Sequence, residues 1–420
     1  MPSASDNPIP EIYVLWHPAC RMGGLIARRI HAWLRPGNGL GPQVFYRCLP
    51  GPESPPGGLP LPLPGEKPRA GLMPTPAQAR FANQQIVVVL IDDHLVADAA
   101  WRHWLGQIAL PGNAEGLRTL MPVALDSTAY NIVEPLRELN FLRPAGLPLP
   151  DFEAAPETAR ESIIRSLLRQ LTEAMCRLML GRTRNGSPPP KNEMGPTKIK
   201  IFLSHAKADG TTPAKRIRDY IYSQTQFAAF YDENDIPFGS SFSRTLLNDI
   251  QSEDTAALIA VRSARYAARP WCRRELSLFR RPIREAVVST SERWRLNPVL
   301  VVDALEGGSQ SAGIHELGNA RVIRWADVPE QEEQIVTTLL RETLLAAFHC
   351  AVGRSLPEAA DQIVLNWLPD PGTLLQIPRV REGQDVKIAY PGRGLSGLEL
   401  DVLDELFPHV EFHSFEEVLA

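Results

Sequence analysis

The stretch RPWCRRELSLF, residues 269–279, combines an aromatic ring and a carboxylate at a spacing that suits a binding site. Pro270 favours the first turn of a helix, and Trp271 and Glu275 then lie four residues apart on one face of it. An aromatic ring beside a carboxylate can exclude water from the acid and can form a wall for a flat ligand. The helix dipole alone also favours an acid near a helix start, so a purely structural role for Glu275 stays open.

Two further stretches carry polar side chains where a predicted strand ends. In FLSHAKADG, residues 202–210, an apolar strand leads into Ser204 and His205. Loop hydroxyls and helix N-termini favour phosphate oxygens, although turn and capping chemistry would explain the same residues. In FYDENDIPFG, residues 230–239, a strand ends at Asp232, and the loop that follows suits either a mobile lid or an ordinary connection.

The elements that must position these residues occur twice, which indicates an internal duplication. Six features of the first half recur in the same order in the second: EIYVLWHPA and KIKIFLSHA, ARRIHAWL and AKRIRDYI, VFYR and AFYD, VVVLI and ALIAV, Trp101 and Trp271, PVALD and PVLVVD. Each half then closes on a predicted amphipathic helix that carries the letters LLR. Apolar strands alternate with helices in both halves, which predicts α/β domains with parallel, doubly wound sheets. Ligands bind such sheets beyond the carboxyl ends of the strands, where the three polar stretches lie.

A polar, proline-rich segment separates the two halves. RTRNGSPPPKNEMGPT lacks periodicity and reads as a linker. We expect a first domain over residues 1–181, a linker over 182–197, a second domain over 198–350 and a small α/β extension over 351–420. The extension reads as strands at 363–368, 386–390 and 410–414 with a helix at 398–407, and its apolar faces must be covered by a domain or by another copy of the chain.

The segments KIKIFLSHAKAD, FYDENDIPFG and WCRREL together resemble the three sequence boxes of Toll/interleukin-1 receptor (TIR) domains. The resemblance covers about residues 198–348 and implies a flavodoxin-like fold, a five-stranded parallel sheet wrapped by helices. Some TIR domains are adaptors that self-associate in signalling. Others, common in bacterial anti-phage defence and in plants and axons, cleave NAD⁺ at the nicotinamide–ribose bond. The glutamate that is essential in the enzymatic kind matches Glu275.

The resemblance also implies roles for other residues. Trp271 would pack beside the nicotinamide-side ribose, and Phe202, Ser204 and His205 would line the nucleotide pocket. The residues implied to gate that pocket are Asp232, Ile236, Pro237, Phe238 and Gly239. NAD⁺ would be a substrate, with no separate cofactor and no metal. Nicotinamide leaves as a neutral base, so one carboxylate that stabilises the oxocarbenium-like transition state would suffice, unlike the two of an O-glycosidase.

The first half keeps the framework without the acid. An ungapped alignment on the tryptophans places Leu105 opposite Glu275, and a small shift places Trp104 there. Arg47 stands opposite Asp232, and His17 stands opposite Ser204. We therefore interpret the first half as a degenerate TIR-like copy, with a partner-sensing or assembly role as a hypothesis.

Composition narrows the setting. The chain has 420 residues, a formal net charge of −4 and five scattered cysteines without metal-ligand spacing, which favours reduced thiols and a cytoplasmic location. The N-terminus lacks the pattern of a signal peptide, and uninterrupted apolar runs such as IVVVLI are too short to span a bilayer, so we expect no membrane association.

An arginine-rich segment also bears on partners. Residues 262–295 hold ten arginines, which suit the phosphates of NAD⁺ or an acidic protein surface better than nucleic acid. The tail is such a surface, because it carries seven acids and no Lys or Arg from Gly394 onward. Expected partners are NAD⁺, further copies of the chain through TIR domains, and a protein of a defence system.

Three functions stay open. The chain is an NAD⁺ glycohydrolase activated by oligomerisation, which makes ADP-ribose or a cyclic ADP-ribose-type product, or it is a non-catalytic TIR scaffold that signals by homotypic assembly. A third possibility is an enzyme of the same fold that acts on other nucleotides.

Overall fold

The computed structural model describes residues 9–35, 41–48, 58–64, 82–109, 118–147, 154–180, 200–230, 255–285, 290–305, 314, 320–392 and 395–419. The expected linker, Asp232 and the loop Ile236–Gly239 lie outside these residues. The chain divides into two compact units, Met1–Ala174 and Met175–Ala420, and each is an α/β unit with its own sheets.

Unit 1 is built on a four-stranded parallel sheet of order β2-β1-β3-β4. The strands are β1 (Pro10–Trp16), β2 (Val44–Tyr46), β3 (Gln84–Ile91) and β4 (Arg118–Ala124). β1 and β3 read as almost continuous apolar runs because both of their faces are buried. Its helices are α1 (Gly23–Leu34), α2 (Asp93–Ala97), α3 (Ala99–Ala109), α4 (Glu134–Arg137) and α5 (Glu157–Leu180), with a 3₁₀ turn at Ser127–Asn131. Trp33 on α1 donates from Nε1 to Thr172 Oγ1 on α5 at 3.0 Å, so these two helices pack together.

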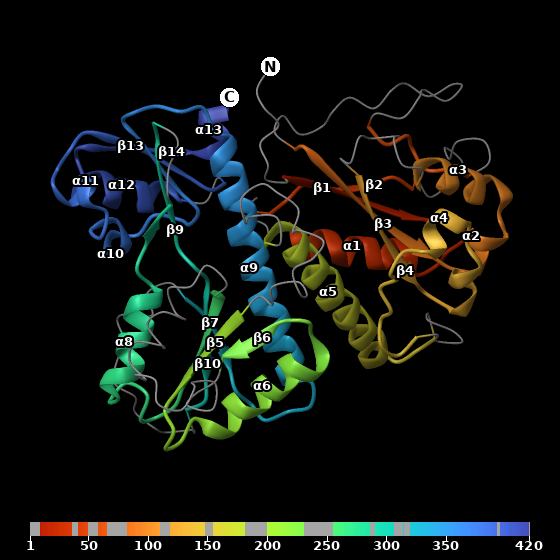
Figure 1. Cartoon of the computed structure of the whole chain (residues 1–420), viewed down its shortest axis with the longest axis horizontal. Coiled ribbons are helices and arrows are strands. Elements are labelled where there is room, and N and C mark those ends of the chain that lie inside the picture. Colours follow the sequence, from red (N-terminus) through yellow and green to blue (C-terminus); the bar gives the residue numbers. More distant parts are fainter. Residues whose placement is uncertain are drawn as a thin grey trace, which may run out of the picture. The chain divides into compact units, whose positions relative to one another are not determined.

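The first sheet of unit 2 has five parallel strands in the order β11-β10-β7-β5-β6. They are β5 (Lys200–His205), β6 (Ala228–Phe230), β7 (Thr255–Arg262), β10 (Val299–Asp303) and β11 (Arg321–Arg324). Helices α6 (Thr211–Gln224) and α9 (Gln331–Ser355) contact one another, and α8 (Pro270–Phe279) packs on β5 from the other side (Figure 1). This sheet has the flavodoxin-like order expected of residues 198–350.

The strand order supports the duplication. Numbered in chain order within each sheet, the strands of unit 1 run 2-1-3-4 and those of unit 2 run 2-1-3-4-5. The fifth position is reduced in unit 1 to a single parallel bridge between Val123 and Leu142. The two halves therefore share one topology.

The C-terminal segment forms a second sheet within unit 2, and this sheet is larger than the sequence indicated. Its order is β14-β13-β12-β9-β8. The strands from the tail are β12 (Gln362–Leu365), β13 (Val386–Tyr390) and β14 (Val410–Ser414). The other two, β8 (Ile283–Arg284) and β9 (Glu292–Arg295), come from the segment between α8 and β10, and β9 pairs with β12 in parallel. Short helices α10 (Pro371–Leu374) and α11 (Pro378–Arg381), and helix α12 (Gly397–Leu406), supply residues to the apolar cluster on this sheet.

Helix α9 joins the two sheets of unit 2. It contacts β7 and β10 of the first sheet and β9 and β12 of the second, and it runs on to Ser355, past the expected domain end at residue 350. The prediction that this helix is amphipathic is wrong, because a helix that packs on two sides is apolar nearly all round. Of the helices among the described residues, α9 is long and apolar enough to cross a membrane by length and composition, and 72% of its most apolar stretch is buried within the protein. Reasoning from uninterrupted apolar runs missed it because polar residues such as Arg341 and His349 interrupt the run.

Candidate functional site

Glu275 is a buried carboxylate near the start of helix α8. The helix begins as predicted, with Pro270 in its first turn, and Cys272, Leu276 and Phe279 form the face that packs on the sheet. Glu275 lies beside this face and is only 8% exposed. A carboxylate at this depth must be hydrogen-bonded, because leaving it bare would cost several kcal/mol.

A chain of two hydroxyl groups supplies that bonding. Ser204 Oγ donates to Glu275 Oε2 at 2.6 Å, and Ser204 Oγ lies 2.8 Å from the hydroxyl of Tyr266. A serine hydroxyl has one proton, so Tyr266 must donate to Ser204 while Ser204 donates to Glu275. Both hydroxyl-bearing residues are 1% exposed or less. In such a dry setting each bond polarises the next and strengthens it.

The strand geometry explains how Ser204 reaches the helix. Side chains alternate along a strand, so Phe202 and Ser204 of β5 point to the same face. Phe202 packs in the cluster that contains Leu276 and Phe279 of α8, and Ser204 follows it at the carboxyl end of the strand. Glu275 therefore lies where a parallel sheet presents its ligand site.

The loops that follow β5 and β7 are tied together at this edge. Asp209 accepts from Ser263 Oγ at 2.6 Å and from the backbone N–H of Arg265 at 2.9 Å. Gly210 closes the turn after β5, and a Cβ there would lie 3.1 Å from the Ala206 carbonyl oxygen, so a side chain would crowd the turn. These contacts fix the loop from which Tyr266 projects.

Cys272 bonds the backbone of the same strand. Burial, with the nearby charge of Glu275, raises the pKa of the Cys272 thiol to about 12. The thiol is therefore protonated at neutral pH, and it donates to the carbonyl oxygen of His205 at 3.4 Å. This bond ties α8 to the end of β5.

The other residues singled out by sequence have different surroundings. Trp271 is half-buried against the α8 cluster, with the Arg274 guanidinium 5.5 Å from its ring centre. Phe202 is 2% exposed and lies within the core, and His205 is partly exposed at the strand end. The structure thus brings Ser204 to Glu275 and places Phe202 beneath them. Sequence reasoning missed Tyr266 and Asp209, although a tyrosine five residues before the tryptophan of WCRREL was a visible signal.

In unit 1 the equivalent edge has other chemistry. Trp104 and Leu105 are buried apolar residues of α3, so the helix has no acid at that level. His17 comes directly after β1, at the position that corresponds to Ser204 near the end of β5. The Nε2 atom of His17 lies 3.4 Å from Asp98 Oδ2. Arg47 is buried, with its guanidinium 4.9 Å from the ring centre of Tyr13.

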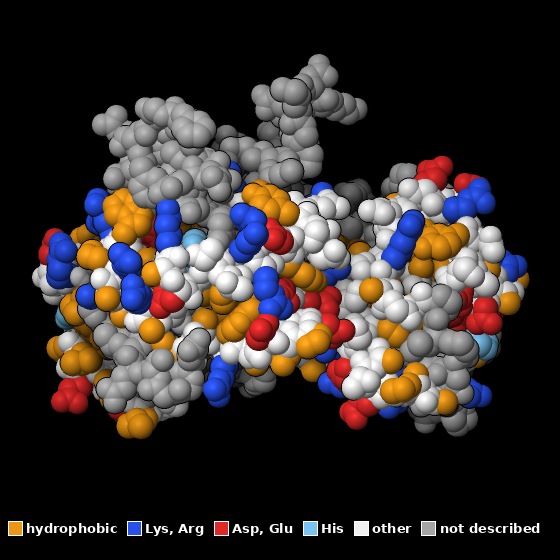
Figure 2. Space-filling model, turned by 90° about the horizontal axis from the view of Figure 1, so that it is seen from below, with side chains coloured by type: hydrophobic (Ala, Val, Ile, Leu, Met, Phe, Trp, Pro, Cys, Tyr) orange, Lys and Arg blue, Asp and Glu red, His pale blue; other side chains and the backbone are white. Residues whose placement is uncertain are grey.

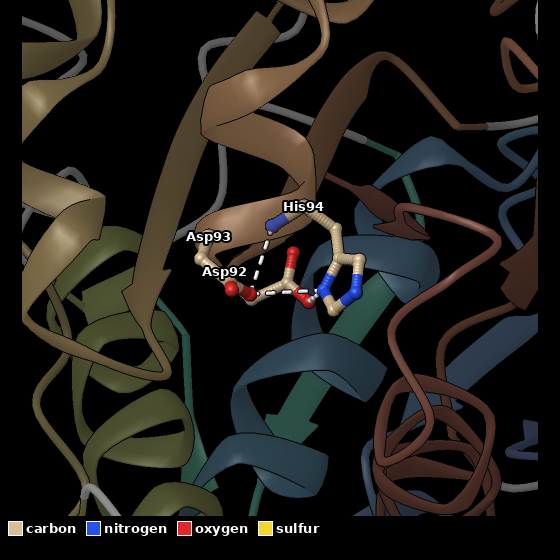
Figure 3. Close-up of side chains that lie close together, drawn as sticks. All are labelled: Asp92, Asp93 and His94. Carbon is tan, nitrogen blue, oxygen red and sulfur yellow. Dashed lines mark hydrogen bonds and ion pairs between the residues drawn. The ribbon is translucent and has the colours of Figure 1, made fainter.

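Asp92, Asp93 and His94 gather at the end of β3 with ligand atoms close enough to hold a metal ion (Figure 3). Their bonds have a structural explanation. Asp92 caps α2 by accepting from Leu95 N at 3.0 Å, and its other oxygen lies 3.1 Å from His94 Nδ1. This cluster reads as helix capping.

A shallow hollow of about 390 Å³ lies elsewhere in unit 2, on the second sheet. Its walls include Lys387, Glu411 and His413. Lys387 pairs with Asp361 at 3.0 Å and His413 with Glu411 at 3.5 Å, so charges around the hollow are largely paired within the sheet. We give more weight to Glu275, because a buried, hydrogen-bonded carboxylate is the more specific chemical feature.

Comparison with known proteins identifies the region around Glu275. Residues 201–340 match the model of the TIR domain family, which confirms the resemblance for that part of the chain. Among solved structures, the chain is similar to the TIR domains of the activated Roq1 resistosome directly recognizing the pathogen effector XopQ. The identity is 17%, the match covers 36% of this chain and 84% of that chain, and the TM-score is 0.19. The search of curated proteins found no match.

Proposed function

We propose that the TIR domain of this chain cleaves NAD⁺ at the nicotinamide–ribose bond, with Glu275 as its catalytic residue. The supporting observation is the placement of the Glu275 carboxylate. It lies at the edge of a parallel sheet where ligands bind, and it is more deeply buried than an acid that only stabilises a helix start needs to be. The hydroxyl of Ser204 holds the orientation of the carboxylate.

One carboxylate is enough for this reaction. As the bond to nicotinamide breaks, positive charge develops on the ribose, and the departing base needs no proton. The hydrogen bond from Ser204 holds the Glu275 carboxylate in one orientation, so its negative charge is already directed at the ribose before the transition state forms. Trp271, His205 and Asp232 would contact the substrate, and the loop Ile236–Gly239 would close over it. Water or the substrate's own adenine would then capture the ribose, giving ADP-ribose or a cyclic product.

The wider setting belongs to the same proposal. The chain would act in the cytoplasm as an anti-phage defence effector, with residues 198–350 as the catalytic domain and residues 1–181 as an assembly or sensing domain. Activity would require association, so the rate per chain should rise with protein concentration. Full turnover by a strictly monomeric sample would contradict this point.

The direct test measures nicotinamide released from NAD⁺ by the full chain. Glu275→Gln keeps the side-chain volume and removes the charge, so we expect a fall of at least about 100-fold in rate, typical for the loss of a transition-state electrostatic contact. Glu382→Gln, an exposed acid in the tail, is the matched control and should leave the rate unchanged. An equal rate for Glu275→Gln and wild type, with both folded by circular dichroism, excludes the mechanism.

One observation favours a non-catalytic scaffold instead. The Glu275 carboxylate is nearly covered, and its hydrogen bond to Ser204 is internal, as a purely structural acid would be. Under that alternative, Glu275→Gln lowers the melting temperature while signalling by assembly persists, and substitutions at Pro237 or Gly239 abolish signalling. Measuring stability beside nicotinamide release separates the two functions.

A further inference from the structure

Helix α12 presents an apolar ridge to solvent. Leu398, Val402 and Leu406 recur at intervals of four residues and are 75%, 46% and 54% exposed. The opposite face holds Leu403 and Phe407, which pack into the core of the second sheet. The helix is firmly built, because Ser396 and Glu399 form a capping box at its start. The ridge is therefore a solvent-exposed surface on an ordered helix. Helix α12 itself is labelled beside the strands of the second sheet in Figure 1.

Acids flank this ridge without basic neighbours on the helix. Asp401, Asp404 and Glu405 are exposed, and α12 itself carries no Lys or Arg. Within the part of the chain that the structure describes, none of these three acids forms an ion pair. Exposed apolar side chains bordered by acids of one sign are typical of a docking surface for a partner with apolar and basic groups.

The chain carries a surface of that complementary kind on helix α8. Trp271, Arg274 and Leu278 follow one another at helical spacing, so they share a face of α8, and Arg281 follows two residues after the helix ends. Trp271 and Leu278 are half-buried, while Arg274 and Arg281 are exposed. No ion pair engages either arginine among the described residues. In the space-filling view, Lys and Arg side chains lie among hydrophobic ones on the part of the molecule that holds unit 2 (Figure 2).

We propose that α12 of one copy of this chain docks on the Trp271, Arg274 and Leu278 face of α8, with Arg281 just beyond it, in a second copy. The leucine ridge would cover the apolar parts of that face, and Asp401 and Glu405 would pair with Arg274 and Arg281. Planar guanidinium groups suit such pairing because each can bond both oxygens of a carboxylate. The interaction rests on charge and shape rather than on NAD⁺ cleavage. Because it would cover Trp271, a docked face cannot contact substrate through that ring at the same time.

The two surfaces differ, so the contact is heterologous. Each copy offers one α12 and one α8. Two copies related by a two-fold axis could exchange both contacts and close as a dimer, and other arrangements build rings or open chains. One helix against another buries a modest area, so we expect association that depends on concentration and weakens as salt screens the charges.

Sedimentation velocity of the full chain, over a range of concentrations at low and high salt, tests the proposal. Wild type should grow in mass with concentration, and less so at high salt. The charge reversals D401K/E405K and R274E/R281E should each raise the dissociation constant at least about tenfold, since like charges then face one another. Substituting the ridge, L398S/V402S/L406S, should have a similar effect. The variant E382K/D385K makes the same charge change at exposed tail positions outside α12 and should associate as wild type does.

Mixing gives the decisive result. Copies with D401K/E405K present two lysines beside the ridge of α12, and copies with R274E/R281E present acids at the α8 face, so a mixture of the two should associate again in alternation. Circular dichroism shows whether each variant is folded. The proposal is overturned if wild type stays monomeric at low salt, if either reversal associates as wild type does, or if mixing restores nothing.

Discussion

At the scale of single residues, the candidate site is a carboxylate whose orientation depends on hydroxyl groups from two other elements. Glu275 comes from α8, Ser204 from β5, and Tyr266 from the loop after β7. The bond from Ser204 reaches a carboxylate and is the stronger of the two, since hydrogen bonds to charged groups contribute about 1.5–3 kcal/mol against about 0.5–1.5 for neutral ones. Removing each hydroxyl should therefore give graded effects.

Ser204→Ala removes the donor to Glu275, and we expect nicotinamide release to fall about ten- to 100-fold, the equivalent of one charged hydrogen bond. Tyr266→Phe removes only the outer bond, so its rate should fall about tenfold or less. Steady-state kinetics should place both losses in kcat rather than in KM, because the hydroxyls orient the acid without needing to touch substrate. A larger loss for Tyr266→Phe than for Ser204→Ala would contradict the proposed order of the hydrogen bonds, in which Tyr266 reaches Glu275 only through Ser204.

At the scale of elements, helix α9 is the shared wall of both sheets in unit 2. It approaches the second sheet tightly at Gly353, where an added Cβ would lie 2.9 Å from Val364 Cγ1 and 3.4 Å from the Phe415 ring. Arg354, the next residue, donates to both carboxylate oxygens of Glu285, beside strand β8. The helix end is thus fixed by a close apolar approach on one side and by a paired arginine on the other.

Gly353→Leu should force the helix away from β12, at a cost of about 1–3 kcal/mol from overpacking. The expected result is a clear drop in the melting temperature of the full chain. Gly353→Ala should cost less, since alanine gains roughly 1 kcal/mol of helix propensity that offsets the contact. Ala347→Leu adds volume at a half-buried position of the same helix and serves as the control. An unchanged melting temperature for Gly353→Leu would show that this approach is loose.

At the scale of the whole molecule, unit 2 is one folded body rather than a TIR domain with an appendage. Strand β9 lies within the TIR segment in sequence but belongs to the second sheet. The tail, residues 356–420, contributes β12 of that sheet, which packs against α9. Buried apolar residues of α9 such as Phe348 and Val352 lie toward its end, where the tail sheet packs. The tail therefore completes the fold.

A chain that ends at Leu356 should lose solubility. It would leave β9 without its parallel partner β12 and would expose apolar surface of α9, which promotes aggregation. The soluble fraction after expression, compared with that of the full chain, measures the effect, and dye binding to exposed apolar surface reports on any soluble remainder. A soluble, cooperatively folding product would show that the tail is an independent extension.

The sequence by itself determined the fold class and the position of Glu275 near a helix start, and it predicted two halves of similar strand order. Those features depend on local patterns: apolar strands buried on both faces, proline at a first helical turn, and a tryptophan four residues before an acid. Tail elements could also be located, because the periodicity of each was clear.

Only the tertiary structure decided which partners those elements take. The sequence ERWR of β9 does not show that this strand joins the second sheet and pairs with β12, because strand pairing depends on which sheet edge is available. By length and overall composition α9 passes both for a helix buried on two sides and for a membrane span, because both need mostly apolar residues. Tyr266 joined the candidate site for the same reason. Its loop approaches β5 only after β5 and β7 have paired, so contacts across 62 residues of sequence depend on the finished sheet.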